Sequence, residues 1–288
     1  MQGFLNIYKE SGESSAKVVS AVKKLVNKNK VGHMGTLDPM ACGVLPIAIG
    51  KATRMFDYFL DKVKSYRAIF TFGYETDTLD ALGEKIKTGG NVPTKGDIDN
   101  AVLNFLGTID QLPPQYSAKN VNGVRAYKLA RMGQSVELST KKVEIVEFKC
   151  LSQIDESSFE FEITCGSGTY IRSLCRDLAY KLGTYATMTF LERTQSGVFD
   201  LTSCVKVNEL SKENLDKYLI SIEDVFPKFG KIFVDELTEK RLLNGQTVFL
   251  DTHVKGKVFV LHETELVGLG EIKNKKIKFD VHLNEEKE

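Results

Sequence analysis

The chain has 288 residues, a length typical of about two domains and ample for a sizeable hydrophobic core. Its 39 Lys and Arg residues and 38 Asp and Glu residues nearly cancel, so the chain as a whole carries no field that would attract nucleic acid. The charge is uneven, however, with ten basic residues against three Asp between residues 17 and 67. Such a region can bind phosphate groups, but an ordinary solvated face would give the same count.

The cysteine and histidine patterns argue against several classes of protein. The five Cys residues contain no CxxC pair and the four His residues are scattered, so the sequence predicts no metal site. The odd number of Cys residues and the lack of an N-terminal signal segment predict a reduced, cytoplasmic protein. No stretch approaches the ~18 consecutive apolar residues of a transmembrane helix, so we expect no membrane association.

Strand and helix patterns alternate in the N-terminal part of the chain. Residues 4–8 and 44–49 have the apolar character of short strands, and residues 65–72 alternate like a half-buried strand. After the first strand, Ser14 or Ser15 can cap a helix whose apolar residues repeat at helical spacing as far as Val26. Residues 53–60 predict a second helix.

Residues 91–140 differ from the preceding segments in their sequence pattern and are predicted to be an insertion in the main fold. They hold a predicted helix at 95–106, a turn-rich segment at 111–118, and a basic helix that carries Arg125, Lys128 and Arg131. Residues 158–165 then alternate as a strand. An amphipathic helix follows from Ile171 to Leu182, and Gly183 is expected to end it.

The last part of the chain predicts a small separate module. The acidic segment 209–224 predicts a helix and a domain boundary. Beyond residue 228, strands are expected at 232–234, 246–250, 257–261 and 276–282, with a helix between Asp235 and Leu243. Strands and helices mix without a regular βαβ rhythm, so the predicted fold class is α+β, with a mixed, largely antiparallel sheet flanked by helices.

One carboxylate, Asp38, lies in a glycine-flanked loop just ahead of the strand at 44–49. Pro39 disfavours the helical region for the residue before it, so Asp38 is expected to be extended. Gly35 and Gly43 allow tight backbone paths and the close approach of a ligand. A carboxylate presented in this way can attack or stabilise a bulky ligand. The alternative is that Asp-Pro only starts a turn, as it commonly does.

Six segments, in order along the chain, resemble the motifs of the TruB-type tRNA pseudouridine synthases. They are the catalytic loop Gly32–Pro39, the tyrosine-bearing strand Lys64–Arg67, the acidic turn Thr76–Gly83, the tRNA-gripping insertion Pro113–Tyr127, the Tyr/Arg segment Gly166–Leu174 and the leucine–arginine strand Leu191–Thr194. The resemblance covers roughly residues 3–225, and the tail from about 230 is similar to a small PUA-like RNA-binding module. Met34, Met40 and Cys42 depart from the usual pattern, but none of them removes a reacting group.

The resemblance implies both a fold and an activity. The implied domains are a pseudouridine-synthase catalytic domain over 1–228, with the tRNA-gripping insertion at 91–140, and a PUA-like module over 229–288. The implied reaction isomerises the T-loop uridine of tRNA (position 55) to pseudouridine and uses neither a cofactor nor a metal. We expect a monomeric, stand-alone enzyme that binds the T arm of tRNA. The alternatives are an RNA-binding protein without catalysis and a dyskerin-type subunit of a guide-RNA particle.

The same resemblance implies four catalytic residues. Asp38 acts on the ribose, either by attacking C1′ or by taking a C2′ proton. Arg172 is expected beside it, where a guanidinium would favour the ionised carboxylate and fix its direction; the alternative is a surface arginine at a helix start. Tyr66 is expected to stack on uracil and Tyr170 to pack beside it, whereas core packing is the alternative for a strand tyrosine. Because a free phenol has a pKa of about 10, either tyrosine would be a poor base unless tuned.

Other residues are implied to bind the substrate. Leu191 would line the uracil pocket, although it could equally be a core leucine. The target uridine must be extruded from its loop, and His33 would lie near the displaced nucleotide unless it only makes a backbone hydrogen bond. The remaining residues implied to contact the RNA are Lys17, Lys24, Arg54, Asp80, Arg125 and Arg131.

Overall fold

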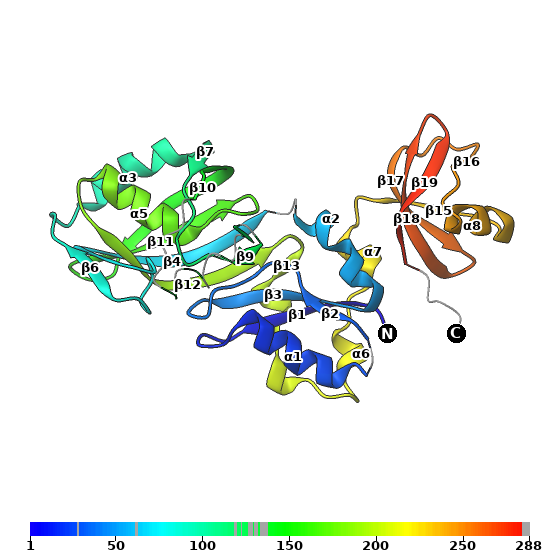
Figure 1. Ribbon diagram of the computed structural model, residues 1–288, viewed down its shortest axis with the longest axis horizontal. Coiled ribbons are helices and arrows are strands. Elements are labelled where there is room, and N and C mark those ends of the chain that lie inside the picture. Colours follow the sequence, from blue (N-terminus) through cyan, green and yellow to red (C-terminus); the bar gives the residue numbers. More distant parts are fainter. Residues whose placement is uncertain are drawn as a thin grey trace.

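The computed structural model describes residues 1–27, 29–60, 63–117, 120–121, 123–125, 129, 132 and 138–283. A large mixed sheet and a second, smaller sheet dominate this part of the chain (Figure 1). The strands of the large sheet are β1 (Gly3–Lys9), β2 (Val31–His33), β3 (Cys42–Ile49), β4 (Lys64–Phe72), β7 (Gly107–Gln111), β10 (Lys141–Gln153), β11 (Ser158–Cys165), β12 (Ala186–Ser196), β13 (Phe199–Asp200) and β14 (Val205–Lys206). Two short hairpins lie outside it, β5 (Tyr74–Thr76) with β6 (Lys85–Thr88) and β8 (Asn120–Val121) with β9 (Val124–Arg125).

The order of the main strands is β14-β1-β3-β12-β4-β11-β10-β7, with β2 paired to β3 and β13 to β12. The β1–β14 and β3–β12 pairs are parallel, and the other described pairs of this sheet are antiparallel. The predicted α+β class with a mixed, largely antiparallel sheet is therefore confirmed. Strand β3 is buried along its whole length, which matches its unbroken apolar sequence.

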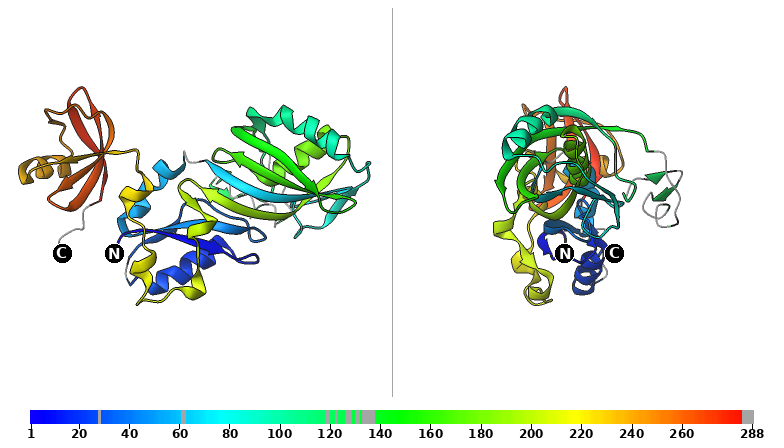
Figure 2. Two further views of the ribbon diagram at one scale, coloured as in Figure 1. Left: turned by 180° about the vertical axis from the view of Figure 1, so that it is seen from behind. Right: turned by 90° about the vertical axis from the view of Figure 1, so that its left-hand side faces the viewer.

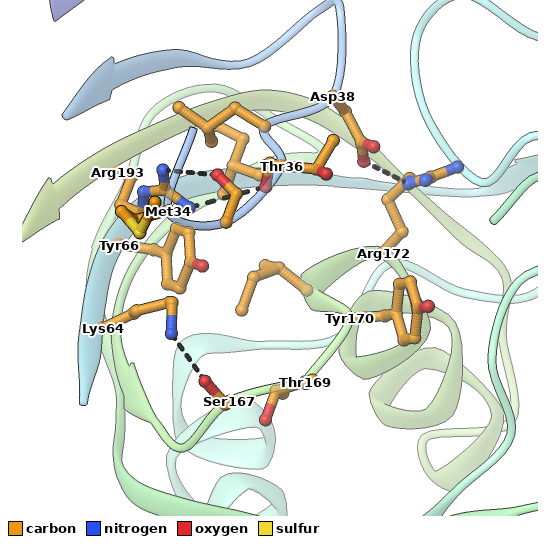
Figure 3. Close-up of a pocket in the computed structure, with 15 residues that line it drawn as sticks. Met34, Thr36, Asp38, Lys64, Tyr66, Ser167, Thr169, Tyr170, Arg172 and Arg193 are labelled. Atoms are coloured by element: carbon orange, nitrogen blue, oxygen red, sulfur yellow. Dashed lines mark hydrogen bonds and ion pairs between the residues drawn. The ribbon is translucent and has the colours of Figure 1, made fainter. Parts of the chain in front are cut away.

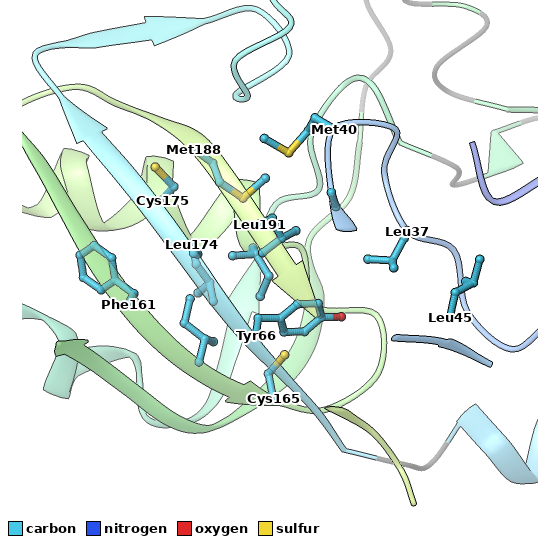
Figure 4. Close-up of a cluster of buried hydrophobic side chains, with 14 of the residues drawn as sticks. Leu37, Met40, Leu45, Tyr66, Phe161, Cys165, Leu174, Cys175, Met188 and Leu191 are labelled. Carbon is cyan, nitrogen blue, oxygen red and sulfur yellow. The ribbon is translucent and has the colours of Figure 1, made fainter. Parts of the chain in front are cut away.

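Helices cover both halves of this sheet (Figures 1 and 2). Helices α3 (Lys95–Val102) and α5 (Ile171–Lys181) lie beside the β10–β11–β4–β12 half, and α1 (Ser15–Leu25) lies beside β1 and β3. Ser14 caps α1 by accepting a hydrogen bond from the backbone of Lys17, and Val18 and Val22 face the core. The main core joins both halves and includes Leu37 and Met40 from the Asp38 loop, so packing fixes that loop directly (Figure 4).

The second sheet has the order β15 (Gly230–Phe233), β17 (Gly256–His262), β18 (Glu265–Lys273), β19 (Lys276–His282) and β16 (Val248–Phe249), with helix α8 (Glu236–Leu243) beside it. Asp235 caps α8 as expected. One apolar cluster extends from the first part of the chain into this sheet, and the rings of Phe229 and Phe259 lie 5.5 Å apart. The second sheet is therefore packed against the rest of the molecule, and the predicted division at residue 228 falls just before it.

Three expected helices differ in detail from the structure. The 53–60 helix is a 3-10 helix, Gly50–Met55, followed by the short α2 (Phe56–Leu60), and the 95–106 helix likewise ends in a 3-10 turn after Val102. The acidic segment forms two one-turn helices, α6 (Leu215–Tyr218) and α7 (Ile222–Val225), because Ile220 between them bridges to Phe4 as extended chain. Strands β10 and β18 are among those that were not predicted from the sequence.

The predicted basic helix also differs, because Arg125 lies in the β8–β9 hairpin rather than in a helix. Gly123, between the two strands of this hairpin, has a φ of +85°, the left-handed conformation that favours glycine. Lys128 and Arg131 lie outside the described residues. The sequence contains an Asn-Gly pair at 122–123, which favours a hairpin turn over a continuous basic helix.

Candidate active site

The loop that carries Asp38 is held on both sides by the segment that leads into α1. Ser15 Oγ accepts from the backbone N–H of Leu37 and donates to the carbonyl of the same residue, both at 3.0 Å. After Asp38, the carbonyl of Pro39 accepts from the backbone of Gly12 at 2.8 Å and from the buried Lys9 ammonium at 3.3 Å. Burial lowers the pKa of Lys9. These contacts fix the backbone on each side of Asp38.

Arg172 lies beside Asp38, as the sequence predicted. Its Nε is 2.8 Å from Asp38 Oδ2, and its side chain is 5% exposed against 32% for the carboxylate. Its two terminal nitrogens donate to the carbonyls of Thr78 (2.9 Å) and Tyr116 (3.1 Å), and Nη1 is 3.5 Å from Asp80. The guanidinium is thus buried and held in one orientation, which rules out the alternative of a surface arginine at a helix start.

A cavity of about 230 Å³ opens beside this ion pair (Figure 3). Tyr66, Tyr170 and Leu191 line it together with Asp38 and Arg172. Burial raises the pKa of Tyr66 to about 12 and also raises the pKa of Tyr170. Both phenols are therefore protonated at neutral pH and can donate hydrogen bonds, and neither is tuned toward a base.

A larger cavity of about 640 Å³ shares Asp38 and Arg172 with the first and extends past His33, Asp80 and Tyr116. The Nδ1 atom of His33 is buried without a hydrogen-bond partner in the part of the chain that the structure describes. Burial and the charge of Arg193 lower the pKa of His33, so its ring is neutral at neutral pH. The backbone hydrogen bond expected under the alternative for His33 is thus absent at this nitrogen.

Asp80 faces this site mainly as a partner of Arg172. It is buried, it accepts from Thr78 Oγ1 at 2.7 Å and from the backbone of Leu82 at 3.1 Å, and it lies 3.5 Å from Arg172. Its oxygens therefore already have protein partners. This geometry assigns Asp80 to the support of Arg172 more directly than to the substrate.

Three of the predicted phosphate contacts lie outside the linings of both cavities. Among the described residues, the cavity linings leave out Lys17, Lys24 and Arg54. Lys17 and Lys24 are exposed on α1, and Lys17 pairs with Glu13 at 2.9 Å. Arg54 is exposed and donates to the carbonyl of His282 in the second sheet at 2.8 Å. Arg125 has a described backbone, while Arg131 lies outside the described residues.

Two buried cations of the site were not singled out from the sequence. Lys64 and Arg193 line the smaller cavity, and Arg193 donates to the carbonyls of Val44 (2.7 Å), Gly35 (3.2 Å) and Thr36 (3.5 Å). Both residues fall inside segments that carry the family resemblance, so the signal was present. In the described part of the chain, no group of three His, Cys, Asp or Glu side chains could hold a metal ion. No helix there is long and apolar enough to cross a membrane.

Comparison with protein families gives the context of this geometry. Residues 23–171 match the TruB family pseudouridylate synthase N-terminal domain, and residues 172–226 match the tRNA pseudouridylate synthase B C-terminal domain. The chain belongs to the TruB family of pseudouridylate synthases. The enzyme class predicted from the sequence, an isomerase, is thereby confirmed. The Asp38–Arg172 pair spans the two matched regions, because the boundary between them falls at residue 171.

Similar proteins support the same family. The tRNA pseudouridine synthase B of Clostridium perfringens (strain ATCC 13124) is 41% identical over 99% of this chain and 100% of its own length. That of Alkaliphilus oremlandii is 39% identical over 95% of this chain and 94% of its own length. Among solved structures, a Cbf5-Nop10-Gar1 complex contains a chain with a TM-score of 0.69 and 26% identity, covering 98% of this TruB-family chain and 84% of that chain.

Proposed function

We propose that this protein isomerises the T-loop uridine of tRNA, position 55, to pseudouridine as a stand-alone enzyme. The observation that supports this most strongly is the Asp38–Arg172 ion pair beside a cavity lined by Tyr66 and Leu191. A protein that only binds RNA requires none of these groups. The identity of about 40% to proteins named tRNA pseudouridine synthase B, over nearly the whole chain, supports the choice of tRNA.

The reaction breaks the bond between C1′ of the ribose and N1 of uracil and forms a bond between C1′ and C5. It needs neither an oxidant nor a reductant, and the departing base is also the returning nucleophile, so one carboxylate suffices in principle. Asp38 either forms an ester with C1′ or takes the C2′ proton to give a glycal. In both routes Arg172 holds the carboxylate in place, since its guanidinium also contacts three residues of two other segments, Thr78, Asp80 and Tyr116.

The walls of the smaller cavity suit a flat base. Tyr66 stacks on uracil, a contact worth ~1–3 kcal/mol for base–aromatic pairs. Leu191 packs on the ring and Tyr170 lies near Asp38 and Arg172 (Figure 3). With a pKa of about 12, Tyr66 acts as a stacking surface and hydrogen-bond donor. Because the pKa of Tyr170 is also raised, we assign the removal of the C5 proton to neither phenol.

The larger cavity would receive the RNA around the extruded uridine. His33 lies in it as a neutral ring that can occupy the place of the displaced base. Asp80 holds Arg172 from this side. We propose phosphate contacts for Lys17, Lys24, Arg125 and Arg131, and for Arg54 from the junction with the second sheet, which we propose to be a PUA-like RNA-binding module.

The dyskerin-type guide-RNA role considered from the sequence is the second candidate, because the chain shares its fold with a chain of the Cbf5-Nop10-Gar1 complex. The identity to that chain is 26%, against 41% to the C. perfringens synthase, and the chain spans the whole of that relative. The stand-alone activity is therefore the better-supported proposal. A monomer in solution is part of it.

The test is incubation of an unmodified tRNA transcript with the protein alone, followed by mapping of pseudouridine at each uridine. The wild type should modify the T-loop uridine without a guide RNA. Asp38→Asn should abolish the product, whereas Asp57→Asn, an exposed aspartate on α2, should leave it unchanged. Absence of product with the wild type would refute the activity, and product formed by Asp38→Asn would refute the site.

A further inference from the structure

The wall of the smaller cavity opposite Asp38 carries two buried cations. Figure 3 shows Lys64 and Arg193 with Tyr66 on one side of the cavity, and Asp38 with Arg172 on the other. Lys64 is 7% exposed and donates from Nζ to Ser167 Oγ at 2.7 Å. A Cβ atom placed on Gly35 would lie 3.7 Å from both the Lys64 side chain and the Arg193 guanidinium, so the two cations flank the same loop residue.

We propose that Lys64 hydrogen-bonds a carbonyl oxygen of the target uracil and, with Arg193 behind it, stabilises the negative charge that the base acquires as it leaves the ribose. This inference rests on the proposed function. Lys64 and Tyr66 are two residues apart on β4, so their side chains lie on the same face of the strand. A base stacked on Tyr66 is therefore held within reach of the Lys64 ammonium.

The chemistry explains why a cation is needed on this wall. When the C1′–N1 bond breaks, its electron pair stays with the base and spreads over N1, O2 and O4. Asp38 forms the C1′ ester or takes the C2′ proton at the other wall, and Lys64 donates a hydrogen bond without giving up its proton. The base then forms the C1′–C5 bond as Asp38 leaves or returns the proton, and the C5 proton is lost while N1 gains one. Preorganised donors at developing charge give large rate effects in a water-excluded site.

The ammonium form of Lys64 is available at neutral pH. Burial and the charge of Arg193 on β12 lower the pKa of Lys64 to about 8, and Cys165 on β11 acts weakly in the opposite direction. The pKa values of Cys165 and Tyr66 are about 11 and about 12, so both stay neutral where Lys64 titrates. Lys141 of β10 is the further cation nearby, against Gly168. Because the protonated form is the active one, the rate should fall as pH rises through about 8.

The same two cations could instead bind a phosphate of the extruded nucleotide, and the two arrangements predict different kinetics. A phosphate contact contributes to RNA affinity and to its salt dependence. A contact to the departing base acts in the transition state, so its loss lowers the rate at saturating RNA and leaves the affinity unchanged.

The experiment measures single-turnover cleavage of the uridine N-glycosidic bond in a synthetic T-arm RNA with the wild type, Lys64→Met, Lys64→Arg and the control Lys149→Met, an exposed lysine on β10. Lys64→Met should lower the rate at saturating RNA by ~10²–10³-fold, as the loss of one oxyanion donor does elsewhere. Its Kd for RNA should stay within about twofold of the wild type, a change of under half a kcal/mol. Lys64→Arg should keep a larger share of the rate and lose the decline above pH 8. Lys149→Met should match the wild type.

The leaving group supplies the sharper test, because fluorine at C5 stabilises the uracil anion. With 5-fluorouridine at the target position, the ratio of wild-type to Lys64→Met rates should be smaller than with uridine. An equal ratio for both bases, an unchanged rate in Lys64→Met, or a change in Kd alone would overturn the inference. Thermal unfolding checks the fold, and if Lys64→Met does not fold, the pH profile of Lys64→Arg decides alone. Inactive wild type would instead count against the proposed function.

Discussion

Replacement of Ser15 by alanine tests whether the first turn of α1 holds Asp38 in place. Ser15 and Leu37 are both buried, and the serine hydroxyl is the partner of both backbone groups of Leu37. Ser15→Ala leaves one buried N–H and one buried C=O unpaired, at ~1–3 kcal/mol each. With partial relaxation, we expect the free energy of unfolding to fall by about 2–4 kcal/mol, which lowers Tm by roughly 5–15 °C at this size.

The effect on catalysis should exceed the effect on RNA binding. Leu37 directly precedes Asp38, and a displacement of about 1 Å at a reacting group can cost ~10²-fold in rate. We therefore expect kcat to fall by ~10–10²-fold with the Kd for tRNA little changed. Single-turnover kinetics and urea denaturation measure the two effects separately.

Ser20→Ala is the matched control for this prediction. Ser20 is on the same helix but is exposed, and its hydroxyl donates only to the carbonyl of Ala16, one turn earlier. Its replacement should change stability by less than about 0.5 kcal/mol. If Ser15→Ala behaved like Ser20→Ala in both measurements, the hydrogen bonds to Leu37 would not be what positions Asp38.

Three further substitutions test other contacts of the site. Gly43→Ala should lower the free energy of unfolding, measured by urea denaturation, by about 3 kcal/mol or more. Gly43 has a φ of +100°, and a Cβ there would lie 2.3 Å from the carbonyl oxygen of Arg193. A variant as stable as the wild type would refute this steric argument. Arg172→Lys should reduce the single-turnover rate of pseudouridine formation by at least ~10²-fold and leave the affinity for RNA unchanged, because an ammonium cannot reproduce the planar fork of donors of a guanidinium. A near-normal rate would show that the positive charge alone suffices. Arg54→Ala should speed amide hydrogen exchange in β19 around His282 and lower the free energy of unfolding by ~1 kcal/mol or less. Unchanged exchange would show that Arg54 does not stabilise the junction between the two sheets.

The elements with strong periodicity could be predicted from the sequence alone. Strand β11 alternates cleanly, and α5 repeats its apolar residues at helical spacing up to the glycine that ends it. The sequence does not predict strand β18, because Gly268 and Gly270 weaken its strand pattern. A Cβ at these positions would lie 2.8 Å and 2.7 Å from the carbonyls of Val281 and Lys278, so the close approach of β19 requires glycine there. Contact with a neighbouring strand decides this case, and a single sequence does not show it.

The residues of the candidate site likewise divide into those that the sequence predicts and those that depend on contacts between distant strands. Asp38, Tyr66 and Arg172 were brought together by motif resemblance, and the structure places all three around one cavity. Lys64 and Arg193 are harder to predict, because charged residues are usually exposed and, apart from the family motifs that contain them, no local pattern marks a lysine that will be buried. Their burial follows from the pairing of β4 and β12, in which Tyr66 lies opposite Arg193. That register is a tertiary property.

The contacts of Arg172 link the segments proposed to face the RNA to Asp38, the proposed catalytic carboxylate. Its guanidinium donates to the carbonyls of Thr78 and Tyr116, and both residues line the larger cavity, where the RNA is proposed to enter. Tyr116 also lies in the segment that resembles the tRNA-gripping insertion. A shift of either segment changes the acceptors of the guanidinium, and the guanidinium in turn orients Asp38 at 2.8 Å. Under the proposed function, we therefore expect correct seating of the RNA loop to change the rate as well as the affinity, and an enzyme can gain specificity in this way from a substrate larger than its reacting base.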